Sequence, residues 1–263
     1  MKHTSLLWRV ASEHHNHIIF LLGTMHSASA PANYYYDRII PYIDSCTYFF
    51  AESNLDHPMF QDSMRMDIPS WIGVRQLLTQ KQYNTVKRIL SQNTDLELDH
   101  IGHISPMMLT SFISEHFLHA GERLPLDLNL WNYAKSKNKI LDGIESAQRQ
   151  AEIFKKIPVQ VQIDQLKDLL SHLSKNRRLI FRIANAYRNQ NLKLLYQLSK
   201  RNMGGIRSIL LYDRNQDMVN RINEIFKYLT GHAMVAIGAA HLPGEKGVLR
   251  LLSKEYRIQS VIL

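Results

Sequence analysis

The chain contains a single cysteine, Cys46, among its 263 residues. One cysteine excludes an intramolecular disulfide, and the apolar stretch around it predicts a small buried side chain. No segment approaches the roughly 18 consecutive apolar residues that a membrane-spanning helix needs. Residues 1–10 also lack the small-residue cleavage site that follows a secretory signal peptide. We therefore expect a cytoplasmic protein without a membrane span.

Acidic residues are in the minority, with 23 Asp and Glu against 32 Lys and Arg, which gives a formal net charge of +9. A basic balance is compatible with nucleic-acid binding, because Lys and Arg supply its sequence-independent part. The positive charges are dispersed, however, and the densest group lies in segments with helical periodicity, whose polar faces need solvated charges. That group is Lys175, Arg177, Arg178 and Arg182. We expect no nucleic-acid partner, and a basic nucleic-acid-associated protein is the weakest of three functional hypotheses.

The length and a hydrophobic content of 45% fit one domain, residues 1–263, with a sizeable core. Strand and helix patterns alternate at both ends of the chain. This predicts an α/β fold with a mixed, largely parallel central sheet flanked by helices, and a helical insertion at roughly 58–137. The expected strands are 6–10, 18–22, 47–51, 139–144, 233–237 and 257–262. The expected helices are 34–43, 71–90, 106–119, 126–136, 158–173, 176–187, 192–198, 206–229 and 245–254.

Two segments far apart in the chain place a histidine three residues after a glycine. They are Gly23-Thr24-Met25-His26 and Gly238-Ala239-Ala240-His241, and each follows a short apolar run suited to a buried strand. Each histidine should therefore lie at the carboxyl end of a strand, which is where open α/β sheets bind ligands. The two segments could deliver two imidazoles to one crevice.

Two carboxylates occupy similar positions, because Glu52 and Glu145 also follow expected strands. Each glutamate alone could simply begin a helix and interact with its dipole. Together with His26 and His241, however, they place four chemically capable groups at four strand ends. Two neutral imidazoles and carboxylate oxygens suit Zn, Mn, Co or Fe, and the spacing does not choose among these metals.

Arg214 lies within the apolar arc of the helix expected at 206–229. A guanidinium on a core-facing stripe needs a carboxylate or an anionic ligand. If it points into the crevice, it could hold a substrate carboxylate or stabilise an oxyanion. The alternative is that Arg214 extends to solvent from a wide helix edge, as Arg207 and Arg221 near the same stripe could also do.

Other histidines and a tyrosine cluster give weaker signals. We expect no site at the turn or at the two pairs with i,i+3 spacing, because the turn is solvated and the pairs lack an obvious acidic partner. These residues are His14, His15 and His17 in the turn, His100 with His103, and His116 with His119. The cluster Tyr34-Tyr35-Tyr36 could line a pocket or pack in the core.

Several motifs together resemble the TraB/GumN family, which includes the Tiki metalloproteases and the pheromone-shutdown TraB proteins, within a wider group of erythromycin-esterase-like and ChaN-like folds. The resemblance runs nearly end to end. Its motifs are Leu7-Trp8-Arg9-Val10, Phe20 to His26, Ala51 to Leu55, Leu126-Asp127, Leu141 to Ser146, Asp213-Arg214-Asn215 with Met218, and Val235 to Gly244. The family pattern Leu-Glu-Leu-Asp reads Ala51-Glu52-Ser53-Asn54 here, which keeps only the first carboxylate.

The resemblance implies a metal-dependent hydrolase, with peptide cleavage as the activity of the Tiki branch and manganese or cobalt as its metals. It carries over His26, Glu52, Arg214 and His241 as functional positions, with Glu145 and Asp127 as further matches.

We expect His26, His241 and Glu145 to bind a divalent metal ion, Mn or Co by resemblance, with Zn or Fe as alternatives. Glu52 could replace Glu145 as the carboxylate ligand. Glu52 is otherwise the expected general base, and Arg214 the expected stabiliser of the oxyanion. The substrate would be a peptide or a small molecule. The alternative function is a non-catalytic protein that sequesters a peptide or haem in the same crevice, and the sequence leaves the oligomeric state open.

Overall fold

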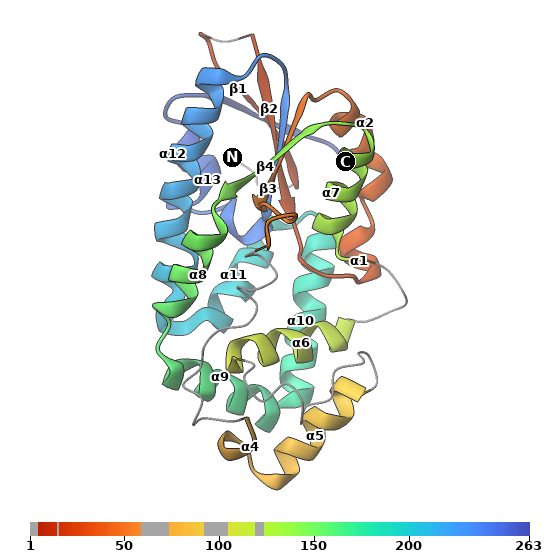
Figure 1. The fold of residues 1–263 in the computed structure, drawn as a ribbon, viewed down its shortest axis with the longest axis vertical. Coiled ribbons are helices and arrows are strands. Elements are labelled where there is room, and N and C mark those ends of the chain that lie inside the picture. Colours follow the sequence, from red (N-terminus) through yellow and green to blue (C-terminus); the bar gives the residue numbers. More distant parts are fainter. Residues whose placement is uncertain (1–4, 15, 59–73, 92–104, 119–123) are drawn as a thin grey trace.

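A single sheet organises the protein, for which the computed structural model describes residues 5–14, 16–58, 74–91, 105–118 and 124–263 (Figure 1). Within these ranges the strand order is β4-β3-β5-β2-β1-β6. The strands are β1 (Leu7–Ala11), β2 (Ile18–Thr24), β3 (Tyr48–Ser53), β4 (Ile140–Glu145), β5 (Ala233–Gly238) and β6 (Arg257–Val261). Each expected strand is present, and the α/β fold with a mixed, mostly parallel sheet is confirmed.

Four neighbouring strands, β4, β3, β5 and β2, run in parallel, whereas β1 is antiparallel to both β2 and β6. The registers align the ends of the parallel strands: Thr24 lies beside Gly238, and Ser53 beside Glu145. The carboxyl ends of the four strands therefore meet at one edge of the sheet, as the sequence predicts for the two Gly-x-x-His segments.

Apolar side chains fill both faces of the central strands, which explains their short, unbroken hydrophobic runs. Met234, Val235 and Leu21 are fully buried, and Cys46 is buried as expected. Gly23 allows a close approach between β2 and the segment that follows β5, because a Cβ there would lie 2.7 Å from Leu242 Cδ1.

Helices cover the two faces of the sheet (Figure 1). On one side lie α2 (Tyr36–Asp44) and α7 (Leu126–Ser136), and on the other lie α12 (Asp213–Tyr228) and α13 (Val248–Leu252). The short helix α1 (Ala30–Asn33) and α8 (Ala147–Lys155) lie lower in the view, near the carboxyl ends of the strands. The helix α8 was not predicted from the sequence. Ser146 caps its first turn, because the Ser146 hydroxyl accepts a hydrogen bond from Arg149 N at 3.1 Å.

A helical lobe lies below the sheet in Figure 1, on the side toward which β2 runs. It contains α4 (Val74–Leu77), α5 (Gln80–Ser91), α6 (Pro106–Leu118), α9 (Val159–Ser171) and much of α10 (Leu173–Arg188). Its own apolar cluster joins α5, α6 and α9. The extent of the insertion at 58–137 stays a prediction, because 59–73, 92–104 and 119–123 lie outside the described residues. No helix in the described part of the chain is long and apolar enough to cross a membrane.

The expected helix at 206–229 is divided into three parts. After α11 (Leu192–Met203), the chain forms a 3-10 turn, η1 (Gly204–Ile206), then a π-helical turn, η2 (Ser208–Tyr212), and then α12. Wide π turns often occur at functional sites. Here the π turn ends one residue before α12 begins with Asp213 and Arg214 in its first turn.

Candidate functional site

A buried cluster of three charges lies at the carboxyl edge of the parallel strands. Arg214 Nε donates to both Glu145 oxygens at 2.9 and 3.1 Å, and Arg214 Nη2 donates to Glu145 Oε2 at 2.5 Å. Nη2 also donates to Glu52 Oε1. The side chains of Arg214 and Glu145 are only 8% and 1% exposed. Arg214 therefore does not extend to solvent, and instead compensates two carboxylates from neighbouring strands.

The hydrogen bonds of Arg214 leave little of its guanidinium free to act on a substrate. Nε and Nη2 are used by the two glutamates, and Nη1 donates to Leu210 O in the π turn at 3.4 Å. A planar guanidinium with five donors is suited to holding two carboxylates at fixed positions. Arg214 is therefore a positioning residue in this arrangement, and its expected role at an oxyanion stays a prediction.

Glu52 is held at both oxygens, because its Oε2 accepts a hydrogen bond from Gly238 N at 2.8 Å. Burial alone would raise the pKa of Glu52, but the charge of Arg214, together with His241 and the Gly238 amide, lowers it to about 2. Burial raises the pKa of Glu145, with Arg214 opposing this effect. A carboxylate with a pKa near 2 is a weak base, so Glu52 is better suited to binding a cation than to removing a proton.

His241 ends the short 3-10 turn η3 (Ala239–His241) and is buried. Its Nδ1 lies 2.6 Å from Asn215 Oδ1, and Asn215 Nδ2 donates to Lys246 O at 2.7 Å. Because the amide nitrogen is used by Lys246, the amide oxygen accepts from Nδ1–H, and the lone pair resides on Nε2. Burial lowers the pKa of His241 to about 4, although Glu52 opposes this, so the imidazole is neutral at pH 7.

Glu52 and His241 both lie beside Gly238. A Cβ on Gly238 would lie 3.3 Å from Glu52 Oε2, 3.4 Å from His241 Cδ2 and 4.0 Å from His241 Nε2. A carboxylate and an imidazole, two groups that can bind a cation, are therefore neighbours of one glycine at this edge of the sheet.

His26 lies nearer to solvent, two residues beyond β2, with 66% of its side chain exposed. Its Nδ1 lies 2.9 Å from Asp127 Oδ2 in the first turn of α7. The hydrogen bond to Asp127 raises the pKa of His26 to about 9, with Glu52 contributing, so His26 is cationic at neutral pH. Within the described residues, no hydrogen bond or ion pair joins His26 to the cluster around Arg214.

Both histidines have the outer hydrogen bond that is typical of metal-binding imidazoles, in which Nδ1 is bound to an oxygen and Nε2 is left for the metal. In the described parts of the chain, however, no three His, Cys, Asp or Glu side chains are grouped so that they could hold a metal ion. Glu145 is the least suited of the expected ligands, since both of its oxygens accept from Arg214. The chemistry of the donors fits a metal, but the structure does not bring three of them together.

The comparison with protein families decides the affiliation of the chain, because the pattern of the TraB/PrgY/gumN family matches residues 6–259. The chain belongs to the TraB/PrgY/gumN family. The match includes β1, the start of β6 and every element of the site between them. Searches of the curated proteins and of the solved structures find no match.

Some residues at the candidate site of this TraB/PrgY/gumN protein were not predicted from the sequence. Glu115 on α6 accepts hydrogen bonds through Oε1 from Ala28 N at 2.7 Å and from Ser27 Oγ at 3.1 Å. It thereby ties the helical lobe to the loop that carries His26, and nothing in the local sequence indicates this contact. Asn215 could have been found, because it follows Arg214 in one of the motifs that carry the family resemblance.

Replacing Glu115 by glutamine should lower the pKa of His26 from about 9 toward its ordinary value of 6.5. The amide oxygen can still accept from Ala28 N, but the negative charge that favours the imidazolium is lost. An NMR titration of the His26 ring measures the change. Asp127→Asn should lower the pKa further, because Asp127 supplies the strongest contribution; an equal or larger effect of Glu115→Gln would contradict this order.

The protein should lose stability as the pH falls from 6.5 toward 4. The unfolded chain binds a proton at His241 in this range, whereas the folded protein resists it until about pH 4. The loss is on the order of 3 kcal/mol for a buried group with this change in pKa. Glu52 adds to the loss between its ordinary pKa of 4.5 and about 2. Urea unfolding at pH 7, 5 and 4 measures how the free energy of unfolding changes with pH. His241→Asn should reduce this change between pH 6.5 and 4. An equal change in the variant would refute the role of His241 in the loss of stability.

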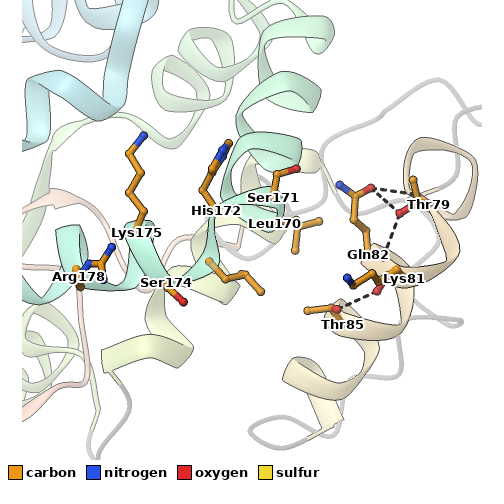
Figure 2. A pocket seen from close by; sticks show the side chains of 11 residues that line it. Thr79, Lys81, Gln82, Thr85, Leu170, Ser171, His172, Ser174, Lys175 and Arg178 are labelled. Carbon is orange, nitrogen blue, oxygen red and sulfur yellow. Dashed lines mark hydrogen bonds between the residues drawn. The ribbon is translucent and has the colours of Figure 1, made fainter.

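A groove of about 660 Å³ lies elsewhere, in the helical lobe between α5 and the junction of α9 with α10 (Figure 2). Figure 2 shows Lys81, Lys175 and Arg178 around it, with hydroxyl groups of threonine and serine between them. None of the site residues expected from sequence lines it. Most of its side chains are exposed, so the sheet edge remains the candidate functional site.

The weaker sequence signals fall partly within the part of the chain that the structure describes. His15, His100, His103 and His119 lie outside the described residues. Tyr35 is buried and donates to Arg188 O at 2.6 Å, which supports core packing for the middle residue of the tyrosine cluster, whereas Tyr34 is 47% exposed.

Proposed function

We propose that the chain is a metal-dependent hydrolase that cleaves peptide bonds. The observation that carries this proposal is that the neutral His241 imidazole and the Glu52 carboxylate both lie beside Gly238. A neutral nitrogen donor and an anionic oxygen donor are the ligand types that Mn, Co and Zn accept. The position at the carboxyl ends of the parallel strands is also where α/β folds bind substrates.

His241 Nε2 and Glu52 Oε2 are the best-placed groups to hold the metal, and His26 Nε2 would become the third ligand only if its side chain moved toward them. The charge of Glu52 acts on both histidines and raises the pKa of each, and only one of its oxygens accepts from Arg214, whereas both oxygens of Glu145 do. This favours Glu52 over Glu145, one of the two alternatives that the sequence leaves open. When bound, the metal would polarise the scissile carbonyl and lower the pKa of a water molecule.

The remaining groups orient the proposed metal ligands and set their protonation states. Arg214 keeps Glu52 ionised and fixes it against the Gly238 amide, and Glu145 in turn fixes Arg214. Asn215 selects the tautomer of His241 in which Nε2 carries the lone pair. Asp127 orients His26, which must release its proton before it can bind a metal, so metal binding at pH 7 should release about one proton.

The test is to strip the purified protein of metal, reload it with Mn, Co or Zn, and incubate it with a peptide library. We expect new fragments by mass spectrometry with at least one metal, and loss of both the metal and the cleavage in His241→Ala. Arg221→Gln, on the outer part of α12, serves as a control for expression and folding. Absence of metal in native mass spectrometry, with cleavage unchanged in His26→Ala and His241→Ala, would refute the proposal.

A second candidate function is sequestration of a peptide or of haem without cleavage. One observation favours it: Glu52, the expected base, is held at both oxygens and has a pKa near 2. A binding protein would retain peptides with their masses unchanged, and a haem-binding protein would develop a Soret band when haem is added. Either result, without cleavage at any metal, would favour sequestration.

A further inference from the structure

The groove between α5 and the junction of α9 with α10 collects positive charge from two separate helices. Lys81 on α5 lines it together with Lys175 and Arg178, which lie in the first two turns of α10 (Figure 2). All three side chains are exposed to solvent. Lys175 and Arg178 belong to the densest basic group of the sequence. Part of that group therefore lines a cavity with a cation from another helix, instead of forming only a solvated helix face.

A ligand that enters this groove meets an excess of positive charge. No aspartate or glutamate is among the described residues that line it. Asp168 on α9 does not line the groove and is paired with His172, a further lining residue, with 3.1 Å between His172 Nδ1 and Asp168 Oδ1. The lysines and the arginine thus determine the charge of the lining, and they favour a ligand with more than one negative charge.

The lining also offers hydrogen-bond donors that suit oxygen atoms. Ser171 ends α9 and Ser174 lies in the first turn of α10, and both are exposed. The two threonines contribute less, because the Thr79 hydroxyl donates to Gln82 Oε1 at 3.1 Å and the Thr85 hydroxyl donates to a carbonyl of its own helix. Serine hydroxyls beside lysines and an arginine are the side-chain donors that bind phosphate oxygens.

Size and composition of the groove restrict the class of ligand. Its volume of about 660 Å³ lies within the range of about 300–1,000 Å³ that is usual for small-molecule pockets. Among the described lining residues there is no phenylalanine, tyrosine or tryptophan on which a nucleobase would stack. Leu170 and Leu173 provide a small apolar contact. A carboxylate brings one negative charge, whereas a phosphate monoester brings about 1.5–2 at pH 7 together with three acceptor oxygens.

We propose that this groove binds a small molecule that carries a phosphate group. Arg178 offers a planar donor fork to the phosphate oxygens, and Lys81 and Lys175 add charge from two different helices. The shared chemistry is that of free phosphate and of a phosphate ester, which the test must distinguish. The site does not depend on the proposed hydrolase, because none of the residues proposed to hold the metal lines the groove.

The test is a calorimetric titration of the metal-stripped, desalted protein at one fixed ionic strength, since salt screens exposed charges. The probes are glycerol 3-phosphate, inorganic phosphate and succinate, which carries two carboxylates. We expect glycerol 3-phosphate to bind about 10-fold more tightly than succinate, or better, because charge-assisted hydrogen bonds to a third oxygen are gained. Arg178→Gln and Lys81→Gln should each weaken this binding by about 10-fold or more.

Arg177 provides the matched control on the same helix. It precedes Arg178 but does not line the groove, and its guanidinium carbon lies 5.6 Å from the ring centre of Phe181. Arg177→Gln makes the same change in net charge and should alter the affinity for glycerol 3-phosphate by less than about threefold. The substituted side chains are all exposed, so the urea midpoint of each variant should stay close to that of the parent.

Each other outcome has a defined meaning. Inorganic phosphate that binds as tightly as the ester would support the site and show that it recognises phosphate alone, whereas weaker binding would support it and show that the ester carbons contribute. Equal binding of succinate and glycerol 3-phosphate, or equal losses in Arg177→Gln and Arg178→Gln, would overturn the site. A single-stranded oligonucleotide that binds more tightly than the ester and depends on Arg178 would overturn it in favour of a nucleic-acid surface.

Discussion

Replacing Arg214 by glutamine is expected to destabilise the protein by about 3–5 kcal/mol, because it removes the cation between two buried carboxylates. Glu145 is 1% exposed at its side chain and would retain a charge without compensation at neutral pH. Its pKa, which burial already raises, would rise further, so the destabilisation should shrink as the pH is lowered. Urea unfolding at pH 7 and at pH 5 measures both effects.

Two further variants make the Arg214 result specific. Adding Glu145→Gln to Arg214→Gln should recover much of the stability, since the second substitution removes the uncompensated charge. Arg221→Gln changes an arginine on the same helix whose ion pair with Asp142 is partly exposed, 31% and 49% at the two side chains. Its effect should stay within about 1 kcal/mol. Equal losses in the free energy of unfolding for Arg214→Gln and Arg221→Gln would show that burial of the Arg214 ion pairs does not determine their contribution to stability.

Replacing His241 by glutamine is expected to reduce kcat/KM for a cleaved peptide by a factor of about 10²–10⁴, the usual range for a group that acts at the reacting atoms. The substitution removes the Nε2 lone pair, which the hydrogen bond between Nδ1 and Asn215 leaves free. Asn215→Ala should cost less, about 10–100-fold, because the imidazole remains but its tautomer and orientation are no longer fixed. Steady-state kinetics on one peptide give both values.

The matched control for His241 lies at the other end of the same strand. His232 precedes β5, and its Nδ1 accepts a hydrogen bond from Ile18 N at 3.2 Å, at the amino edge of the sheet. His232→Gln should keep the kinetic constants within a factor of about three of the parent, within the scatter expected for a surface change of about 0.5 kcal/mol. A loss as large as that of His241→Gln would mean that general damage to β5, rather than the imidazole, explains the effect.

The sheet could be predicted because its signals are local. Unbroken apolar runs at 18–22 and 233–237 can only be buried on both faces, and each run became a strand close to its expected bounds. The helix α8 was missed because its sequence, AQRQAEIFK, holds few apolar residues from which a helical period can be recognised. The π turn at Ser208–Tyr212 was missed for a different reason, since apolar periodicity does not distinguish it from the α-helix that follows.

The sequence predicted which residues belong to the candidate site, but it did not predict which of them contact one another. The sequence indicated that Arg214 needs a carboxylate or an anion, and the structure supplies Glu52 and Glu145, which are 162 and 69 positions away. Such partners depend on which strands become neighbours, which spacing alone does not reveal. The distance of His26 from the Arg214 cluster has the same origin, because a hydrogen bond to Asp127 on α7 holds the ring at the rim of the site.

The position of β5 between β3 and β2 has a consequence for how the protein is made. The ribosome synthesises β2 and β3 before β5, which pairs with both of them, so neither strand can form this pairing until β5 has emerged. The packing of Gly23 against Leu242 and the hydrogen bond from the Gly238 amide to Glu52 form only after β5 and the residues that follow it have been synthesised. The nascent chain therefore carries two unpaired strand edges until β5 emerges, and the pairing of β5 completes the sheet and the candidate site in the same step.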